Sequence, residues 1–587
     1  MAAAVAAVVV AAVVAAAASA AAPASAGEPT RDVRWEVGYM TVAPLGVSQK
    51  VIAINNQFPG PLLNVTTNWN VRVNVQNNLD EPLLLTWDGI QMRMNSWQDG
   101  VAGTNCPIPP GWNWTYQFQL KDQIGSFFYF PSLGLQRAAG GFGPVTVNNR
   151  AVVPVPFAQP DGDITLFIGD WYTKSHVELR KMLDDGKDLG IPDGILINGK
   201  GPYSYDNTLI PEGLQHETVG VEPGKTYRFR VHNVGTSTSL NFRIQNHNMR
   251  LVEAEGTYTY QQNYTNLDIH VGQSYSFLVT MDQNASTDYY IVASPRFVTN
   301  ESRWHDVNGV AVLQYSNSKG RASGPLPDGP NDFYYKSYSM DQARSIKLAD
   351  LHNLTGVYKT DFPTMPGNAP PKMASSTLNA SYKGFLEIVF QNNDTGVQTY
   401  HLDGYSFFVV GMDNGDWTPD CRSRYNKWDA ISRSTTQEVY VKVADPLGYN
   451  ITEMIMPDNA LYCGLLKDLQ KPQIHQVNSK SSAQAADRWG ARVLAMVLLI
   501  IAAVATTSKH HRRDKDKDPD RERPSSSRHH HHHHHRDDKD GERDRDRDRH
   551  HREKERDREE RKARERDKEK ERARRREESS RSRRHGA

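Results

Sequence analysis

The sequence predicts an all-β protein built from three tandem Greek-key sandwiches. Short segments that alternate apolar and polar residues recur along the chain, separated by Gly, Pro and Asn turns, as expected for half-buried strands of packed sheets. Residues 1–150 contain no segment with a useful run of helical periodicity after the apolar N-terminus. A length of 587 residues allows three or four domains. Together these observations favour a multidomain β-sandwich protein.

The first sandwich is predicted over 27–150. Its clearest strands alternate apolar with polar residues, at 51–55, 70–76 and 115–120. Two further stretches, 84–90 and 125–136, begin as apolar and aromatic strands and end in turns. We expect the side chains at these two strand ends to face a shared cavity between domains.

The second sandwich is predicted over 151–325. Strands are expected at 163–171 and 226–233, and a short helical segment at 174–183 follows the first of them. The stretch 316–330 is rich in Ser, Gly and Pro, which is typical of a boundary between domains.

The third sandwich, predicted over 326–475, is shorter than its pattern requires. Strands are expected at 387–392 and 400–411, but 438–443 then follows Gln437 at once, where two more strands should intervene. By the usual strand lengths roughly thirty residues are missing at 437/438, which we interpret as a lost exon or a faulty gene model. A sandwich without core strands would expose its edges and fold poorly.

The ends of the chain carry targeting signals. Residues 1–26 are almost all Ala and Val and end in Ala-Ser-Ala, which is typical of a secretory signal peptide; a membrane-spanning anchor is the alternative. In 476–508, small residues, a polar spacer and a short apolar run follow one another, as in a lipid-anchor (GPI-type) attachment signal. The run is too short for a transmembrane helix, which needs about 20 residues.

A low-complexity tail of Arg-Asp, Arg-Glu and His repeats occupies 509–587. Its composition cannot bury a core, so we expect disorder or a solvated helix. Such a tail contradicts secretion, and we interpret it as read-through or fusion. The alternative hypothesis is tail-mediated RNA association, although mixed charge alone is a weak signal for nucleic acid.

Asn-x-Ser/Thr sequons support secretion independently of the termini and predict a glycoprotein. The sequon asparagines are Asn64, Asn113, Asn263, Asn284, Asn300, Asn353, Asn379, Asn393 and Asn450. All of them precede the tail. Three cysteines are also present, of which two should pair in an oxidising compartment.

Three stretches resemble the copper-binding motifs of multicopper oxidases, especially plant ascorbate oxidases and laccases. Thr-Trp-Asp-Gly at 86–89 and Phe-Pro-Ser at 130–132 stand where that family has His-Trp-His-Gly and His-Gly-His. Gln-Thr-Tyr-His-Leu-Asp-Gly at 398–404 resembles His-Pro-x-His-x-His-Gly. The resemblance implies cupredoxin-like sandwiches whose ligand positions are mostly substituted. The substituted positions are Thr86, Asp88, Phe130, Ser132, Gln398 and Asp403, and only His401 still matches.

This substitution pattern removes the family's chemistry. Residues 1–150 contain no histidine, so the half of the trinuclear copper cluster that the family's first domain supplies is absent. We therefore expect no catalytic residue and no cofactor, with His401 as a relic metal ligand that leaves room for one copper ion, or as a packing histidine. Asp88 and Asp403 could instead form a carboxylate pair of the glycosidase kind, or fill the space that the metals left.

The resemblance also pairs Cys106 with Cys463, which leaves Cys421 buried or free. Among such proteins the chain resembles the plant skewed-growth group of monocopper oxidase-like proteins, or ascorbate oxidase homologues, whose members are glycosylated, often lipid-anchored and short of copper ligands. This implies a non-catalytic role in directional cell expansion at the outer face of the plasma membrane, apoplast or cell wall. The implied partners are the membrane and wall polysaccharide or wall protein, not nucleic acid. A copper-dependent oxidoreductase with an unrecognised site is the alternative hypothesis.

Overall fold

A computed structural model describes most of the first two domains and part of the third. The described residues are 28–93, 95–201, 216–298, 304, 306–330, 336–349, 385–392, 397–437, 440–444 and 463. The predictions for 1–26, 476–508 and 509–587 concern segments outside these residues. Within the described part, no helix is long and apolar enough to cross a membrane.

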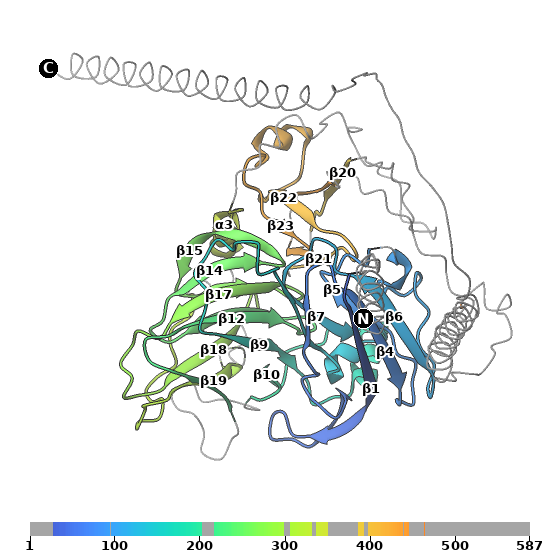
Figure 1. The fold of residues 1–587 in the computed structure, drawn as a ribbon, viewed down its shortest axis with the longest axis horizontal. Helices are drawn as coiled ribbons and strands as arrows, with labels where there is room; N and C mark the ends of the chain where they lie inside the picture. Colours follow the sequence, from blue (N-terminus) through green and yellow to red (C-terminus); the bar gives the residue numbers. More distant parts are fainter. Residues whose placement is uncertain are drawn as a thin grey trace, which may run out of the picture. The chain divides into compact units, whose positions relative to one another are not determined.

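Domain 1 is a sandwich of two four-stranded sheets, with orders β2-β1-β4-β6 and β3-β8-β7-β5 (Figure 1). Its strands are β1 Thr30–Val42, β2 Gln49–Ile54, β3 Leu63–Thr66, β4 Asn70–Asn77, β5 Leu85–Asp88, β6 Asn113–Gln119, β7 Gly125–Pro131 and β8 Gly143–Asn148, with short 3-10 helices η1 Ser96–Gln98 and η2 Gln136–Ala139. In β4, Val71, Val73 and Val75 are fully buried because alternate side chains point to the core. The alternation predicted at 70–76 is therefore confirmed.

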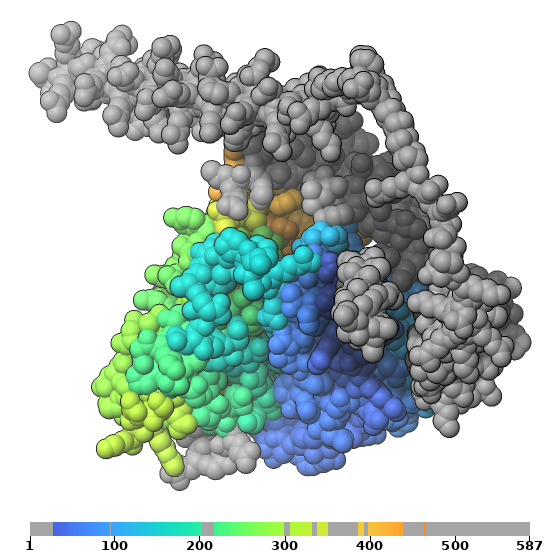
Figure 2. All heavy atoms as spheres, in the orientation of Figure 1, coloured from blue at the N-terminus to red at the C-terminus, as the bar shows by residue number. Residues whose placement is uncertain are grey.

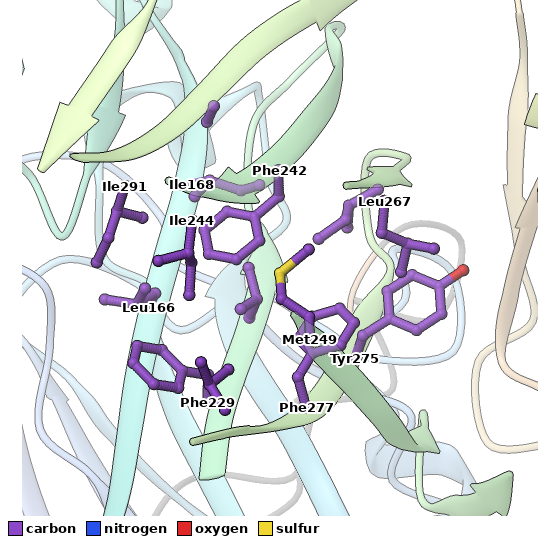
Figure 3. Packing of buried hydrophobic residues seen from close by; sticks show 14 of the residues in the cluster. Leu166, Ile168, Phe229, Phe242, Ile244, Met249, Leu267, Tyr275, Phe277 and Ile291 are labelled. Atoms are coloured by element: carbon purple, nitrogen blue, oxygen red, sulfur yellow. The ribbon is translucent and has the colours of Figure 1, made fainter. Parts of the chain in front are cut away.

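Domain 2 packs a six-stranded sheet, β10-β9-β12-β17-β14-β15, on a five-stranded one, β11-β19-β18-β13-β16. Its elements are β9 Gly162–Trp171, α2 His176–Asp184, β10 Gly194–Ile197, β11 Glu217–Val221, β12 Thr226–Asn233, β13 Ser239–Ile244, β14 Met249–Ala254, β15 Thr257–Tyr264, β16 Leu267–Ile269, β17 Ser274–Thr280, β18 Tyr289–Arg296 and β19 Gly309–Tyr315. Figure 3 shows Leu166 and Phe229 of one sheet and Phe242 and Ile291 of the other filling the space between the sheets.

Domain 3 is smaller in the part that the structure describes. Helix α3 Lys336–Ser345 precedes two sheets, β20-β25-β22-β23 and β21-β24. Their elements are β20 Phe385–Val389, β21 Thr399–His401, β22 Phe407–Gly411, η4 Pro419–Arg424, β23 Ser432–Arg433, β24 Thr435–Gln437 and β25 Tyr440–Ala444. Strand β25 comes almost directly after β24, in the order the sequence indicates. The loss of strands at 437/438 stays a prediction.

The domains adjoin one another through polar contacts as well as apolar ones. Figure 2 shows the blue surface of domain 1 continuous with the cyan and green surface of domain 2. At this junction the Ser126 amide of β7 donates to Glu253 of β14 at 2.8 Å. Glu255, just after β14, accepts hydrogen bonds from Arg433 and Ser434 of domain 3. These buried contacts join domain 2 to domains 1 and 3.

Candidate functional site

A cavity of about 360 Å³ lies where residues of the three domains meet. Domain 1 contributes the ends of β5 and β7, domain 2 the turn between β16 and β17, and domain 3 strands β21 and β24. The cavity is lined by Thr86, Asp88, Gly100, Val101, Ala102, Phe130, Ser132, Arg137, Val271, Gly272, Thr399, His401, Asp403 and Thr435. All sequence-predicted ligand positions except Gln398 are therefore together. Gln398 is exposed on the surface and does not line the cavity.

Strands β5 and β7, together with Ser132 directly after β7, hold four of these positions. They pair antiparallel, with Thr86 opposite Phe130, and Thr86 and Asp88 share one face because side chains alternate along a strand. The hydroxyls of Thr86 and Ser132 each donate to the carbonyl of Gly100, at 2.9 Å. Both hydroxyl protons are thus used within the protein, and neither side chain offers the nitrogen or sulfur donor that a copper site of this kind needs.

Gly100 makes this arrangement possible. Its φ is +87°, and a Cβ at this position would lie 2.0 Å from the carbonyl oxygen of Leu85. Only glycine accommodates both the left-handed backbone and the close approach. The turn 97–100 therefore brings a carbonyl acceptor to the cavity wall.

The imidazole of His401 lies between two carboxylates. Its Nδ1 is 2.7 Å from Thr435 Oγ1 and 3.8 Å from Asp88 Oδ2, and its Nε2 is 3.3 Å from Asp403 Oδ1. Burial opposes protonation, but Asp88 and Asp403 outweigh it and raise the pKa of His401 to about 9. Burial raises the pKa of Asp88 to about 7, and His401 opposes that shift. The imidazolium of His401 therefore lies between Asp88 and Asp403. These two side chains do not face each other as a free carboxylate pair.

These residues do not fit the copper centre that the family motifs would build. Such centres use several neutral imidazoles, and a thiolate at the blue site. Of the described residues that line the cavity, only His401 carries an imidazole, and an imidazolium has no free nitrogen lone pair for a metal. In the described ranges no three His, Cys, Asp or Glu side chains are placed to hold a metal ion.

The sequence interpretation gave no role to Arg137 or Thr435, and both line the cavity. Arg137 is in η2, with its guanidinium carbon 4.6 Å from the centre of the Phe130 ring. Arg137 is only five positions after Ser132 in the sequence, so its nearness to a ligand position was a usable signal that it lines the cavity. Thr435 is 34 residues from His401 and reaches it through the β21–β24 pairing, for which the sequence carries no local signal.

Cys106 and Cys463 form a disulfide, with Cα atoms 5.8 Å apart. This is the pairing that the resemblance implies, and it ties domain 1 to a residue far along the chain. Cys421 is buried and free.

The sequon asparagines within the described residues are accessible for modification. Exposed side chains are found at Asn64, Asn113, Asn263 and Asn284. The remaining predicted positions lie outside the described residues, at Asn300, Asn353, Asn379, Asn393 and Asn450.

Comparison with known proteins agrees with the motifs. Three family models described as multicopper oxidase match residues 36–152, 162–318 and 343–442. The chain is 53% identical to the monocopper oxidase-like protein SKU5 of Arabidopsis thaliana, in an alignment that covers 81% of this chain and 95% of that protein. It is 41% identical to the L-ascorbate oxidase homolog of Brassica napus (75% and 93% covered) and 28% identical to the L-ascorbate oxidase of Cucurbita maxima (70% and 84% covered).

The alignment with SKU5 is longer than the part of this chain that it covers. It spans 567 aligned positions, whereas it uses 81% of 587 residues. Some positions that are filled in that relative are therefore empty here.

Solved structures show the fold. A laccase from Botrytis aclada superposes with a TM-score of 0.58 at 22% identity, covering 71% of this chain and 83% of the laccase. Fet3p, a multicopper oxidase that functions in iron import, superposes with a TM-score of 0.56 at 20% identity, covering 70% and 85%. The predicted cupredoxin-like architecture is confirmed.

Proposed function

The chain belongs to the multicopper oxidase family, and from this premise we propose that it is a non-catalytic member that acts outside the cell. In this proposal it is secreted, glycosylated and held on the outer face of the plasma membrane by a lipid anchor, where it serves directional expansion of the cell at the wall. The observation that carries the proposal is the set of side chains in the cavity between the domains.

An oxidase of this family passes electrons through bound copper to oxygen, so its activity depends on the imidazoles that hold the metal. Here His401 is paired with Asp88 and Asp403, and the hydroxyls of Thr86 and Ser132 are bonded to the main chain. The two hydroxyls are thus satisfied by the main chain, and the ion pair between His401 and Asp88 joins domain 1 to domain 3. This arrangement supports a structural or binding role for the cavity.

The extracellular part of the proposal has separate support. A disulfide such as Cys106–Cys463 persists in oxidising compartments, and the described sequon asparagines are exposed. The role in directional expansion rests on the resemblance to the skewed-growth group. We expect glycosidase treatment to increase the electrophoretic mobility of the chain, and a phosphatidylinositol-specific phospholipase to release it from plant-cell membranes. A chain that stays unglycosylated inside the cell would contradict this part.

A copper-dependent oxidoreductase is the second candidate, and membership of the family favours it. Oxygen uptake with phenols or ascorbate separates the two candidates. We expect the secreted full-length chain, supplied with copper, to consume oxygen no faster than a matched copper solution, while a copper-bearing ascorbate oxidase serves as the positive control. Saturable, substrate-dependent uptake that disappears in His401→Ala would refute the non-catalytic proposal.

A further inference from the structure

Two ionisable side chains of the cavity, Asp88 and Arg137, lack hydrogen bonds to any described residue. The Asp88 carboxylate is only 4% exposed, and its contact with His401 Nδ1 at 3.8 Å is too long for a hydrogen bond. The Arg137 guanidinium forms neither a hydrogen bond nor an ion pair within the described chain and lies over the Phe130 ring. Leaving the buried Asp88 side chain without a hydrogen bond is costly. Both side chains line the same cavity, which points to a bound molecule.

Neighbouring residues do not supply the hydrogen bonds that Asp88 and Arg137 lack. The Nδ1 atom of His401 is within 2.7 Å of Thr435 Oγ1, and its Nε2 atom faces Asp403. Asp88 therefore keeps free acceptor positions, and Arg137 keeps free donor positions. A ligand that satisfies both must donate hydrogen bonds to Asp88 and accept hydrogen bonds from Arg137.

The charges and the volume narrow the class of ligand. Among the residues that line the cavity, two basic side chains, His401 and Arg137, face two acidic ones, Asp88 and Asp403, so a ligand without net charge is compatible with the lining. Hydroxyl groups both donate and accept, and adjacent ring hydroxyls reach an acid and a guanidinium together. A volume of about 360 Å³ is within the range of small-molecule sites and leaves room for one sugar ring.

We propose that this cavity binds one sugar ring of a glycan through its hydroxyl groups, with Asp88 accepting and Arg137 donating hydrogen bonds. The inference deepens the proposed function and rests on it, since a copper centre would fill the same space. Neutral sugars and uronates share the required hydroxyls. The test separates these two sources.

The test is a titration of the secreted full-length chain with glucose, galactose, galacturonate and short oligogalacturonates, by calorimetry and saturation-transfer NMR. We expect at least one of these sugars to saturate a single site. Asp88→Asn and Arg137→Gln should each weaken binding about ten- to a hundredfold, the usual effect of losing a hydrogen bond to a charged group. Asp32→Asn, which changes an exposed carboxylate paired with Arg72, is the matched control and should bind like the parent chain.

A second variant guards against loss of folding. Ala102 is exposed and lines the cavity, so Ala102→Trp narrows the cavity without removing a charged group and should abolish binding, with an unchanged thermal unfolding curve. Preference for galacturonate that is lost in Arg137→Gln would assign the site to uronates, and equal binding of neutral sugars would assign it to the hydroxyls alone. Both results support the proposal.

The proposal is overturned if no sugar saturates, if the Asp88, Arg137 and Asp32 variants bind equally, or if oligomers bind and Ala102→Trp has no effect. An absence of sugar binding can be told apart from a failure of the proposed function. A copper-free chain that binds no sugar refutes this inference alone, whereas stoichiometric copper with oxygen uptake refutes the proposed function as well.

Discussion

Replacing Glu255 by Gln should loosen the strand that completes the cavity. Glu255 is 5% exposed, and its carboxylate accepts hydrogen bonds from Arg433 Nη2 at 2.6 Å and from the amides of Ser434 at 2.7 Å and Thr435 at 2.9 Å. These bonds fix the start of β24 to domain 2. Because Thr435 contacts His401, the same carboxylate positions one side of the cavity.

The distance sets the scale of the effect. For the 2.6 Å pair, an effective dielectric constant of about 20 gives a Coulomb attraction of about 6 kcal/mol, which the loss of solvation on burial partly offsets. Removing one partner of a buried pair costs about 3–5 kcal/mol, because the other charge stays buried without its partner. Such a loss corresponds to a hundredfold or larger change in an opening equilibrium.

Hydrogen exchange measured by mass spectrometry detects this local opening of β24. In Glu255→Gln we expect peptides covering 434–437 to exchange at least a hundredfold faster, while peptides from β4 keep their protection. The double variant Glu255→Leu/Arg433→Met removes both charges and should lose less protection than the single variant. A change below tenfold in the single variant, or equal loss in the double variant, would show that the Glu255–Arg433 pair does not hold β24 in place.

Two other perturbations test the packing around the site. Burial lowers the pKa of His232 from 6.5 to about 3, so the unfolded chain binds a proton first, and stability should fall by about 1.4 kcal/mol per pH unit as the pH drops from 6.5 towards 3. In His232→Asn, the free energy of unfolding measured with denaturant should fall less steeply with decreasing pH, by that amount. An unchanged pH dependence would count against this prediction. Gly100→Ala places a Cβ 2.0 Å from the Leu85 carbonyl and should cost at least ~3 kcal/mol and lower the secreted yield. The control Gly103→Ala, also at positive φ but with nothing within 4 Å, should cost only about 1–3 kcal/mol of backbone strain, and equal effects would contradict the steric argument.

Local sequence patterns predicted most of the fold. Strands at 70–76 and 226–233 follow from alternating residues, and the structure confirms them as β4 and β12. The helical segment at 174–183 is confirmed as α2, where Ser175 and Glu178 form a capping box. Such signals lie within a few residues of one another, so a single sequence contains them.

The candidate site could be predicted only where motif spacing reports it. Thr86, Asp88 and His401 meet in one cavity, as the strand-end argument expects. The role of Glu255 depends on partners from a distant segment: Glu255 and Ser434 are 179 residues apart. No local periodicity tells which buried charge will meet which partner, so these contacts required the structure.

Copper content distinguishes a metal-free cavity from a copper site. The secreted full-length chain, and a form that ends at Ser482 and so lacks the histidine-rich tail, would be dialysed against a weak chelator and analysed by mass spectrometry for metals. We expect well below one copper per chain in the shorter form, without a blue absorption band. One or more equivalents of copper in that form, lost on His401→Ala, would refute the non-catalytic proposal and restore a metal site to the cavity.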